Sequence, residues 1–362
     1  MDNKILIVFK NNKIDVQNFS ELKNNEIYKI WEKIIEDYNL WVSEFKDIKI
    51  TKDKKKITEI LKWRGMSLWW INSLCRKDTE LNNQWIHRMF ILYLIKELKK
   101  VKIFLEIETD DRLLIHSINK NFNLNLIKIT KIFNIKSFFK NYLKLFINIK
   151  NSIYFFFQTI FKVCFLKLFK YQQKKKFINK NFIWFLTYYP LNWVDLDHNE
   201  LYDRHLHKLP ISDHSKENNV GYLVYLNNFF KRNLFKISFK KLKKIFKSDY
   251  VLIESHINFY DIFEVFISSY KILIKIYFLK KNLKKNFIIN DIDFFEILYY
   301  ELKKSFWVDN QYNMLHGIAQ KNFIKDINCP QKIITYDELW TQSRVGYYLC
   351  KKLNNQLQKL SL

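Results

Sequence analysis

The chain has 362 residues and 48% of them are hydrophobic, so it can bury a core as one large domain with an insertion or as two modest domains. Its net charge of +26 includes a lysine bias typical of an AT-rich genome, but the surplus still attracts phosphates on nucleic acid, anionic lipid or a nucleotide-sugar. The four cysteines lack metal spacing and the N-terminal apolar run is too short for a signal peptide, which excludes a secreted disulfide framework and predicts a reducing, cytoplasmic compartment.

The first 60 residues predict a strand and a helix. Residues 4–9 read KILIVF, a short apolar run that is typical of a buried strand and predicts the first strand of an α/β sheet. From residue 27 to residue 40, apolar side chains recur every three or four positions, which is the period of one helix face. Residues 51–56 form a solvated run of lysines.

The tryptophan-rich stretch at residues 62–85 predicts a loop that leads into a helix. Gly65 lets the backbone turn where a Cβ atom would clash, and Ser67 can cap the first free amides of the next helix. Trp69 and Trp70 follow directly. They either fill a core or offer a surface for recognition.

Residues 84–129 predict the order helix, strand, helix, strand. The helix covers residues 84–100, the strand VKIFLEI covers 101–107, a second helix runs through Ile118, and a second strand covers 124–129. This order is typical of a parallel sheet, whose ligands bind beyond the carboxyl ends of the strands.

An acidic turn at residues 108–111 follows the first of these strands. Its functional interpretation is a carboxylate that binds a hydroxyl group. The alternative is structural, because either Asp110 or Asp111 can cap the next helix while its neighbours stay solvated.

Residues 135–177 are almost purely aromatic, aliphatic and lysine. The most apolar part, 153–169, is interrupted by Gln158, Lys162 and Lys167, whereas crossing a bilayer takes about 20 mostly apolar residues. A basic helix with bulky aromatic residues fits the plane of an anionic membrane surface, so this surface is an expected partner. The alternative is a long helical hairpin packed on the protein's own core.

The second half of the chain predicts strands and helices in alternation. The expected strands cover 181–190, 221–226, 250–254 and 332–335, and the expected helices cover 258–274, 291–307, 312–323 and a last one through 353. No further strand is expected in the C-terminal tail. The basic stretch at 231–247 predicts a solvated amphipathic helix, and nucleic-acid binding is the weaker alternative because no RRM, KH or zinc-finger pattern supports it.

A polar loop at residues 192–219 holds four of the eight histidines. His205 and His207 with Asp203 could bind a metal, but an i, i+2 pair without a third ligand at defined spacing is a weak signal. No metal site and no cofactor is therefore expected.

Four stretches, taken together and in order, resemble one family. They are R-G-M-S-L-W-W at 64–70, F-L-T-Y-Y-P at 185–190 with D-R-H-L-H-K-L-P at 203–210, the strand end at 251–255, and the segment 307–340. The family is a set of bacterial surface-carbohydrate biosynthesis proteins, glycosyltransferases of the two-Rossmann-domain (GT-B) kind. Residues 336–342 depart from its pattern, because Glu338 is present but the family's Asn-Gln pair and trailing Trp-Glu are not.

The resemblance implies an α/β fold with a Rossmann-like parallel sheet flanked by helices, the N-terminal half of a GT-B architecture, with a basic aromatic helical insertion. The expected segments are 1–134 and 178–350 for the α/β domain, 135–177 for the insertion, and 351–362 for a C-terminal tail. Family members continue into a second Rossmann domain, which this chain is expected to lack. A separate polypeptide that supplies this domain is an expected partner, and a non-catalytic remnant or subunit is the alternative function.

The activity implied by the resemblance is sugar transfer from a nucleotide-sugar to a glycan or lipid-linked acceptor, in the cytoplasm or on the inner membrane face. Such chemistry needs a base for the acceptor hydroxyl and positive charge for the departing phosphates. The candidate bases are Glu338, Glu254 and Asp110, and the candidate substrate-binding residues are Arg64, Gly65, Ser67, Trp69, Trp70 and Tyr188. The structural alternatives are that Glu338 caps a helix, that Arg64 pairs with a surface acid and that the tryptophans fill the core. No specific nucleic-acid partner is expected.

Overall fold

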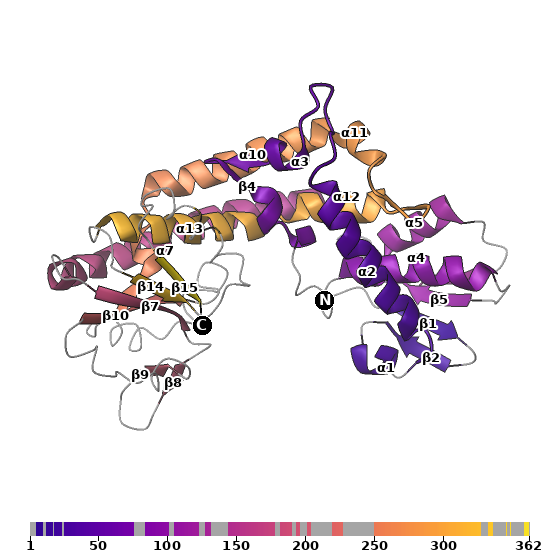
Figure 1. The fold of residues 1–362 in the computed structure, drawn as a ribbon, viewed down its shortest axis with the longest axis horizontal. Coiled ribbons are helices and arrows are strands. Elements are labelled where there is room, and N and C mark those ends of the chain that lie inside the picture. Colours follow the sequence, from indigo (N-terminus) through magenta and orange to yellow (C-terminus); the bar gives the residue numbers. More distant parts are fainter. Residues whose placement is uncertain are drawn as a thin grey trace. The chain divides into compact units, whose positions relative to one another are not determined.

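A computed structural model shows two compact units in the chain (Figure 1). Unit 1 comprises Met1–Ile149 and Tyr270–Trp307, and unit 2 comprises Lys150–Ser269 and Val308–Leu362. This division cuts across the segments predicted from the sequence. The structure describes residues 5–9, 12–16, 18–23, 25–75, 84–100, 105–122, 127–131, 144–177, 182–189, 193–195, 201–203, 219–226, 250–326, 332–335, 345, 348 and 358–361.

Unit 1 contains a mixed four-stranded sheet in the order β2-β1-β5-β6. The strands are β1 (Ile5–Phe9), β2 (Asn12–Asp15), β5 (Leu105–Thr109) and β6 (Ile127–Lys131). Helix α5 (Arg112–Asn121) connects β5 to β6, which are parallel as predicted, whereas β1 is antiparallel to both β2 and β5. The expectation of a parallel sheet is therefore wrong for β1, because an apolar run such as ILIVF fits either strand direction.

Two long helices cover much of the unit 1 core. In α2 (Tyr28–Phe45) the buried residues recur every three or four positions, and they are Trp31, Ile34, Tyr38, Trp41 and Phe45. In α4 (Gln84–Lys100) every residue from 85 to 95 is buried, so this helix is enclosed. The ring centres of Tyr38 and Trp85 lie 4.6 Å apart, which joins the two helices through aromatic contact.

Helix α5 begins at a buried ion pair. The side chain of Asp111 accepts hydrogen bonds from the backbone amides of Leu113 and Leu114 and so caps the helix. The same carboxylate lies 2.6 Å from Nε of Arg88 on α4, and both side chains are almost wholly buried. Asp111 is therefore the helix cap of the acidic turn, and it also neutralises an enclosed guanidinium.

Unit 2 contains a five-stranded sheet in the order β11-β10-β7-β14-β15, and every neighbouring pair is parallel. The strands are β7 (Phe182–Tyr189), β10 (Asn219–Leu226), β11 (Tyr250–Leu252), β14 (Lys332–Thr335) and β15 (Gln358–Ser361). If the five strands are numbered by their occurrence along the chain, their order across the sheet is third, second, first, fourth, fifth. β15 contradicts the expectation of a tail without a strand, since four residues with few apolar side chains give too little pattern to predict one.

Three long helices contribute to unit 2: α13 (Asp309–Asp326), most of α7 (Lys144–Phe177) and the first half of α10 (Phe259–Phe278), whose residues from Tyr270 onward belong to unit 1. All of residues 310–320 in α13 are buried. Gln311 bonds Ser152 of α7 at 3.1 Å, and the ring of Phe323 lies 4.9 Å from that of Trp184 on β7. Helix α13 thus contacts both a helix and the sheet.

The remaining described elements are short. They are α1 (Phe19–Lys23), α3 (Ile57–Ile60), β3 (Lys62–Trp63), β4 (Met66–Ser67), η1 (Leu68–Ile71), η2 (Ser73–Cys75), β8 (Trp193–Asp195), β9 (Leu201–Asp203), η5 (Ile253–His256), α11 (Lys280–Lys284), β12 (Ile288–Ile289), β13 (Ile292–Asp293) and α12 (Phe295–Lys304).

Replacing Asp111 by alanine removes the helix cap and deprives the buried Arg88 guanidinium of the carboxylate that neutralises it, so we expect the free energy of unfolding to fall by about 3–5 kcal/mol. Asp111→Asn retains an oxygen for the cap but removes the negative charge, and we expect it to recover only a minor part of the loss. Urea unfolding measures both variants. Asp47→Ala, which breaks the exposed ion pair with Lys56, is the control, and an equal loss there would contradict the prediction.

Gly317 lies where α13 meets Val345. A Cβ atom added at Gly317 would overlap the Val345 side chain. We therefore expect Gly317→Ala to lower the free energy of unfolding by about 1–3 kcal/mol, although alanine is the better helix former. In the double variant Gly317→Ala/Val345→Ala, the loss of unfolding free energy should be smaller than the sum of the two single losses, because the shortened Val345 side chain no longer overlaps the added Cβ atom. Simple additivity of the losses in urea unfolding would exclude the overlap as the cause.

Candidate functional site

The tryptophan-rich stretch forms a β-hairpin that leads into a 3₁₀-helix. Strands β3 and β4 are antiparallel, and the turn between them holds Arg64 at φ 48° and Gly65 at φ 87°. Two successive residues with positive φ are the signature of a tight type I′ hairpin turn. The predicted conformational role of Gly65 is confirmed, and the Arg64 guanidinium carbon lies 5.3 Å from the ring centre of Trp63.

Ser67 caps the helix that follows this hairpin, as predicted. Its Oγ accepts a hydrogen bond of 3.3 Å from the backbone amide of Trp69 at the start of η1. Trp69 is fully buried, 5.1 Å from Phe45 between ring centres, so it belongs to the core. Trp70 is 44% exposed, and Nζ of Lys46 lies 6.0 Å from its ring centre. Only Trp70 of this pair therefore offers a surface to a ligand.

The predicted site residues divide between the two units. Arg64, Gly65, Ser67, Trp69 and Trp70 share the hairpin and η1 of unit 1, and the half-buried Asp110 lies between β5 and α5 of the same unit. Tyr188 and Glu254 belong to unit 2, where they follow or end parallel strands. Glu338 lies outside the described residues, as do His205 and His207.

Tyr188 and Glu254 stand at the carboxyl edge of the unit 2 sheet. Tyr188 is the penultimate residue of β7 and pairs with Tyr225 of β10, one position beyond the pair of Val224 with Leu252 of β11. Glu254 follows Leu252 by two residues, on η5. The end of β14 reaches the same part of the sheet, because Thr335 pairs with Leu186 of β7. This edge is where parallel sheets bind their ligands.

Glu254 is paired with a histidine that the sequence analysis did not single out. Oε1 of Glu254 lies 3.7 Å from Nδ1 of His316 on α13, and both side chains are completely buried. The ring of Tyr312 contacts His316 edge-on at 4.3 Å between centres. This separation is longer than a hydrogen bond, so the structure shows an electrostatic contact between a carboxylate and an imidazole, the two group types most often used in general acid–base sites.

A second histidine, His256 on η5, belongs to a separate network. Nδ1 of His256 lies 2.7 Å from a carboxylate oxygen of Asp326, and the amide of Asn322 donates to the His256 carbonyl and to Asp261 at 2.9 Å each. The Asp261 carboxylate also accepts a hydrogen bond from the backbone amide of Asn258, which holds the start of α10. We interpret this network as a connection between η5, α10 and the end of α13.

The first half of α13 is unusually polar for an enclosed helix. Within the described residues, both side-chain amide atoms of Asn310 and Nδ2 of Asn313 have no hydrogen-bond partner, although they are buried. Unsatisfied buried amides are costly, so such atoms mark positions where a polar ligand gains contacts. The sequence signal was a set of polar residues that an ordinary core helix does not carry. Asn313, His316 and Gln320 fall within the predicted helix 312–323, and Asn310 and Gln311 directly precede it.

Helix α7 adds a buried lysine to the same unit. The inner face of α7 carries Ser152, Phe155, Thr159, Lys162 and Leu166, all buried. Burial lowers the pKa of Lys162 to about 7 because the charged ammonium loses its hydration. A lysine with this pKa exchanges protons near neutrality, which an ordinary lysine does not.

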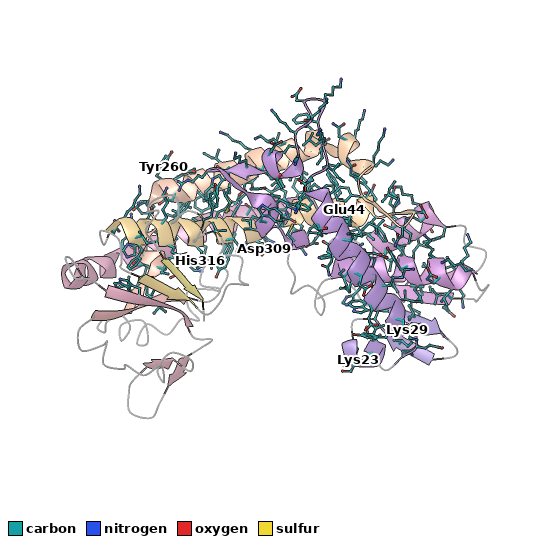
Figure 2. The ribbon with its side chains drawn as sticks, in the orientation of Figure 1. Lys23, Lys29, Glu44, Tyr260, Asp309 and His316 are labelled. Carbon is teal, nitrogen blue, oxygen red and sulfur yellow. The ribbon has the colours of Figure 1, made fainter. Side chains whose placement is uncertain are left out.

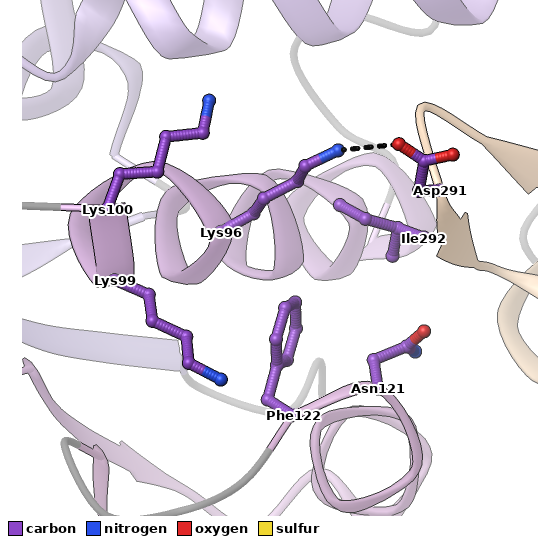
Figure 3. Close-up of a pocket in the computed structure, with 7 residues that line it drawn as sticks. All are labelled: Lys96, Lys99, Lys100, Asn121, Phe122, Asp291 and Ile292. Carbon is purple, nitrogen blue, oxygen red and sulfur yellow. Dashed lines mark ion pairs between the residues drawn. The ribbon is translucent and has the colours of Figure 1, made fainter.

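Unit 1 contains an open pocket of about 350 Å³ at the ends of α4 and α5 (Figure 3). Nζ of Lys96 forms an ion pair of 3.5 Å with Asp291, and Phe122 forms one wall. The lining residues are Lys96, Lys99, Lys100, Asn121, Phe122, Asp291 and Ile292. Its charge suits a small anion, but the Asn121 amide is committed to backbone carbonyls.

Neither a metal cluster nor a membrane span occurs in the described part of the chain. Among those residues no group of three or more His, Cys, Asp or Glu side chains could hold a metal ion. No helix there is long and apolar enough to cross a membrane.

Lys162→Met tests the buried lysine through the pH dependence of stability. Between pH 7 and the ordinary lysine value of 10.5, the unfolded chain holds a proton that the folded chain has released, so stability of the native protein rises with pH. The methionine variant lacks this contribution and should show a flatter profile over that range. Urea midpoints measured across these pH values would contradict the prediction if the two profiles ran parallel.

Comparison with protein-family models found no match, and searches of curated proteins and of solved structures found none at the significance required. The resemblance to surface-carbohydrate biosynthesis proteins therefore stays a prediction from the sequence.

Proposed function

We propose that the protein is a nucleotide-sugar-dependent glycosyltransferase of surface-polysaccharide synthesis, with its nucleotide at the carboxyl edge of the unit 2 sheet. The observation that supports this most is the parallel sheet whose strands stand in the order third, second, first, fourth, fifth. This is the order of the Rossmann-like nucleotide-binding sheet. Ligands of such sheets bind where the strand order reverses, which here is between β7 and β14.

The ends of these two strands carry residues suited to such a ligand. Tyr188 is the penultimate residue of β7, and tyrosine is a residue type that suits stacking on a base or a sugar. Glu338 comes three residues after Thr335, the last residue of β14. Both residues are also candidate site residues on the sequence pattern alone, which supports the proposal.

The proposed reaction transfers a sugar from phosphate to a hydroxyl group. The acceptor oxygen attacks the anomeric carbon, the bond from that carbon to the phosphate oxygen breaks, and the nucleotide leaves with the bonding electrons. A base takes the acceptor proton. Of the candidate bases, Glu254 is favoured by its contact with His316, and we assign the proton to this pair. Arg64 and Trp70, the substrate-binding residues expected from the sequence, belong to unit 1 and take no part in this unit 2 site, while Trp69 fills the core.

A non-catalytic, membrane-docked subunit is the second candidate function. The inner face of α7 packs in unit 2, but Ile153, Tyr154, Phe157 and Phe161 on the same helix are exposed. These side chains support the proposed contact of residues 135–177 with an anionic membrane, and hence a peripheral cytoplasmic location. A separate polypeptide with the second Rossmann domain remains the proposed protein partner.

Titration calorimetry of the full chain with UDP, GDP and CMP tests nucleotide binding. We expect one of these nucleotides to bind, and Tyr188→Ala to weaken that binding by about tenfold, since base–aromatic stacking contributes about 1–3 kcal/mol. Tyr260→Ala, at an exposed tyrosine of the same unit, should bind as the native protein does. Failure of all three nucleotides to bind would contradict the proposal.

The acid–base pair is tested by hydrolysis of the matching nucleotide-sugar, with water in place of the acceptor. Glu254→Gln and His316→Asn should lower the rate by about 10²–10⁴-fold while nucleotide affinity is kept. Glu264→Gln on α10 is the control and should leave the rate unchanged. Unaltered hydrolysis in both variants would remove the pair from the mechanism.

A further inference from the structure

Unit 1 carries an exposed surface that combines lysines with large apolar side chains. It is formed by the end of α10, by α11 and by β12, and its lysines are Lys271, Lys275, Lys280, Lys281, Lys284 and Lys285, all exposed. Its exposed apolar residues are Ile274, Tyr277, Phe278 and Ile288. No aspartate or glutamate occurs between residues 265 and 290. We call these ten residues the basic-apolar surface.

Lysines and apolar residues share one face of α10. Residues 271, 274, 275 and 278 are spaced i, i+3, i+4 and i+7, so they lie on the same side of the helix. Ile272 and Ile276 lie on the opposite side and are buried at 3% and 0% exposure. Lysine side chains on such a face can extend past the apolar groups while keeping their ammonium groups in water. The exposed apolar groups therefore belong to the outward face of a well-anchored helix.

A lysine-rich loop adjoins this surface. The loop at residues 49–56 contains Asp53 as its one acid, and Lys52, Lys54 and Lys55 are exposed. The side-chain amide of Asn282 on α11 donates to the carbonyl of Ile50 at 3.0 Å, which fixes the loop beside α11 (Figure 1). Nζ groups of both elements therefore contribute to one positive field.

We propose that the basic-apolar surface docks on an anionic phospholipid membrane. Such a membrane offers negative headgroups to the lysines and an acyl boundary to Ile274, Phe278 and Ile288, so it satisfies both features. Nucleic acid would neutralise the lysines but leave the aliphatic groups in water. A second copy of the chain would place lysines against lysines. This surface is distinct from the exposed face of α7, and the inference does not rest on glycosyl transfer.

Co-sedimentation of the full chain with vesicles tests the inference. Vesicles of phosphatidylcholine with phosphatidylglycerol should bind the protein, and phosphatidylcholine alone should bind it much more weakly. Because one lysine near an anionic surface changes affinity about fivefold, Lys281→Gln/Lys284→Gln should weaken binding by about tenfold or more. The matched control is Lys23→Gln/Lys29→Gln, which removes the same charge from α1 and α2 (Figure 2) and should bind nearly as the native protein does.

Phe278→Ser tests the apolar half of the surface. Phe278 is 78% exposed, so its loss should not disturb the core, and we expect vesicle binding to fall by about tenfold. Leu40→Ser, at a side chain that is 58% exposed on α2, is the control and should change little. Thermal unfolding of each variant confirms that the fold is retained.

Three outcomes would overturn the inference. Equal losses of vesicle binding in Lys281→Gln/Lys284→Gln and in the control Lys23→Gln/Lys29→Gln would show that net charge alone attracts the protein to the membrane. Loss of binding in Phe157→Ser/Phe161→Ser, with none in the variants of the basic-apolar surface, would assign docking to α7. A lysine dependence without a Phe278 dependence, together with competition by duplex DNA, would identify nucleic acid as the partner.

Discussion

The packing of unit 2 depends on burying α13 on all its sides. Contacts reach this helix from η5 through Glu254 and His316, from α7 through Ser152 and Gln311, and from β7 through Trp184 and Phe323. A helix enclosed in this way is usually apolar throughout. Here asparagine, glutamine and histidine occupy its enclosed positions, so its burial requires partners for polar groups as well as complementary shape.

This requirement connects stability to the proposed chemistry. Burying a carboxylate and an imidazole together costs more than burying two apolar groups of the same size, so the Glu254–His316 pair is not explained by stability alone. The pair stands near the edge where the parallel strands end. The buried Lys162, with its pKa near 7, adds a second group in the same unit that can change charge without leaving the interior.

The aromatic residues of the chain serve two opposite purposes. In unit 1, α2 and α4 use them to fill an enclosed core, where Trp31 contacts Phe90 and Tyr38 contacts Trp85. On α10 and α7 the same residue types face outward. Burial already holds the opposite faces of these helices, so the exposed parts of the outward aromatics are not needed to fill the core. Their exposure is better explained by a partner than by folding.

The sequence by itself determined the features that depend on neighbouring residues. The 3.6-residue period located α2 and α4, and apolar runs located β1, β5 and β7. Local backbone chemistry assigned Gly65 to a turn, Ser67 to a helix cap, and either Asp110 or Asp111 to a second cap. These features form within a few residues, where sterics and hydrogen bonding act directly. Glu254 was singled out for the same reason, because it follows a predictable strand.

Only the tertiary structure decided which distant residues meet. It set β1 antiparallel to β5, paired β15 with β14, buried Trp69 while exposing Trp70, and placed His316 beside Glu254. An apolar run does not encode strand direction, and adjacent tryptophans have the same composition whichever one faces inward. Such outcomes follow from packing between elements far apart in the chain, and local sequence patterns therefore did not predict that His316 lies beside Glu254.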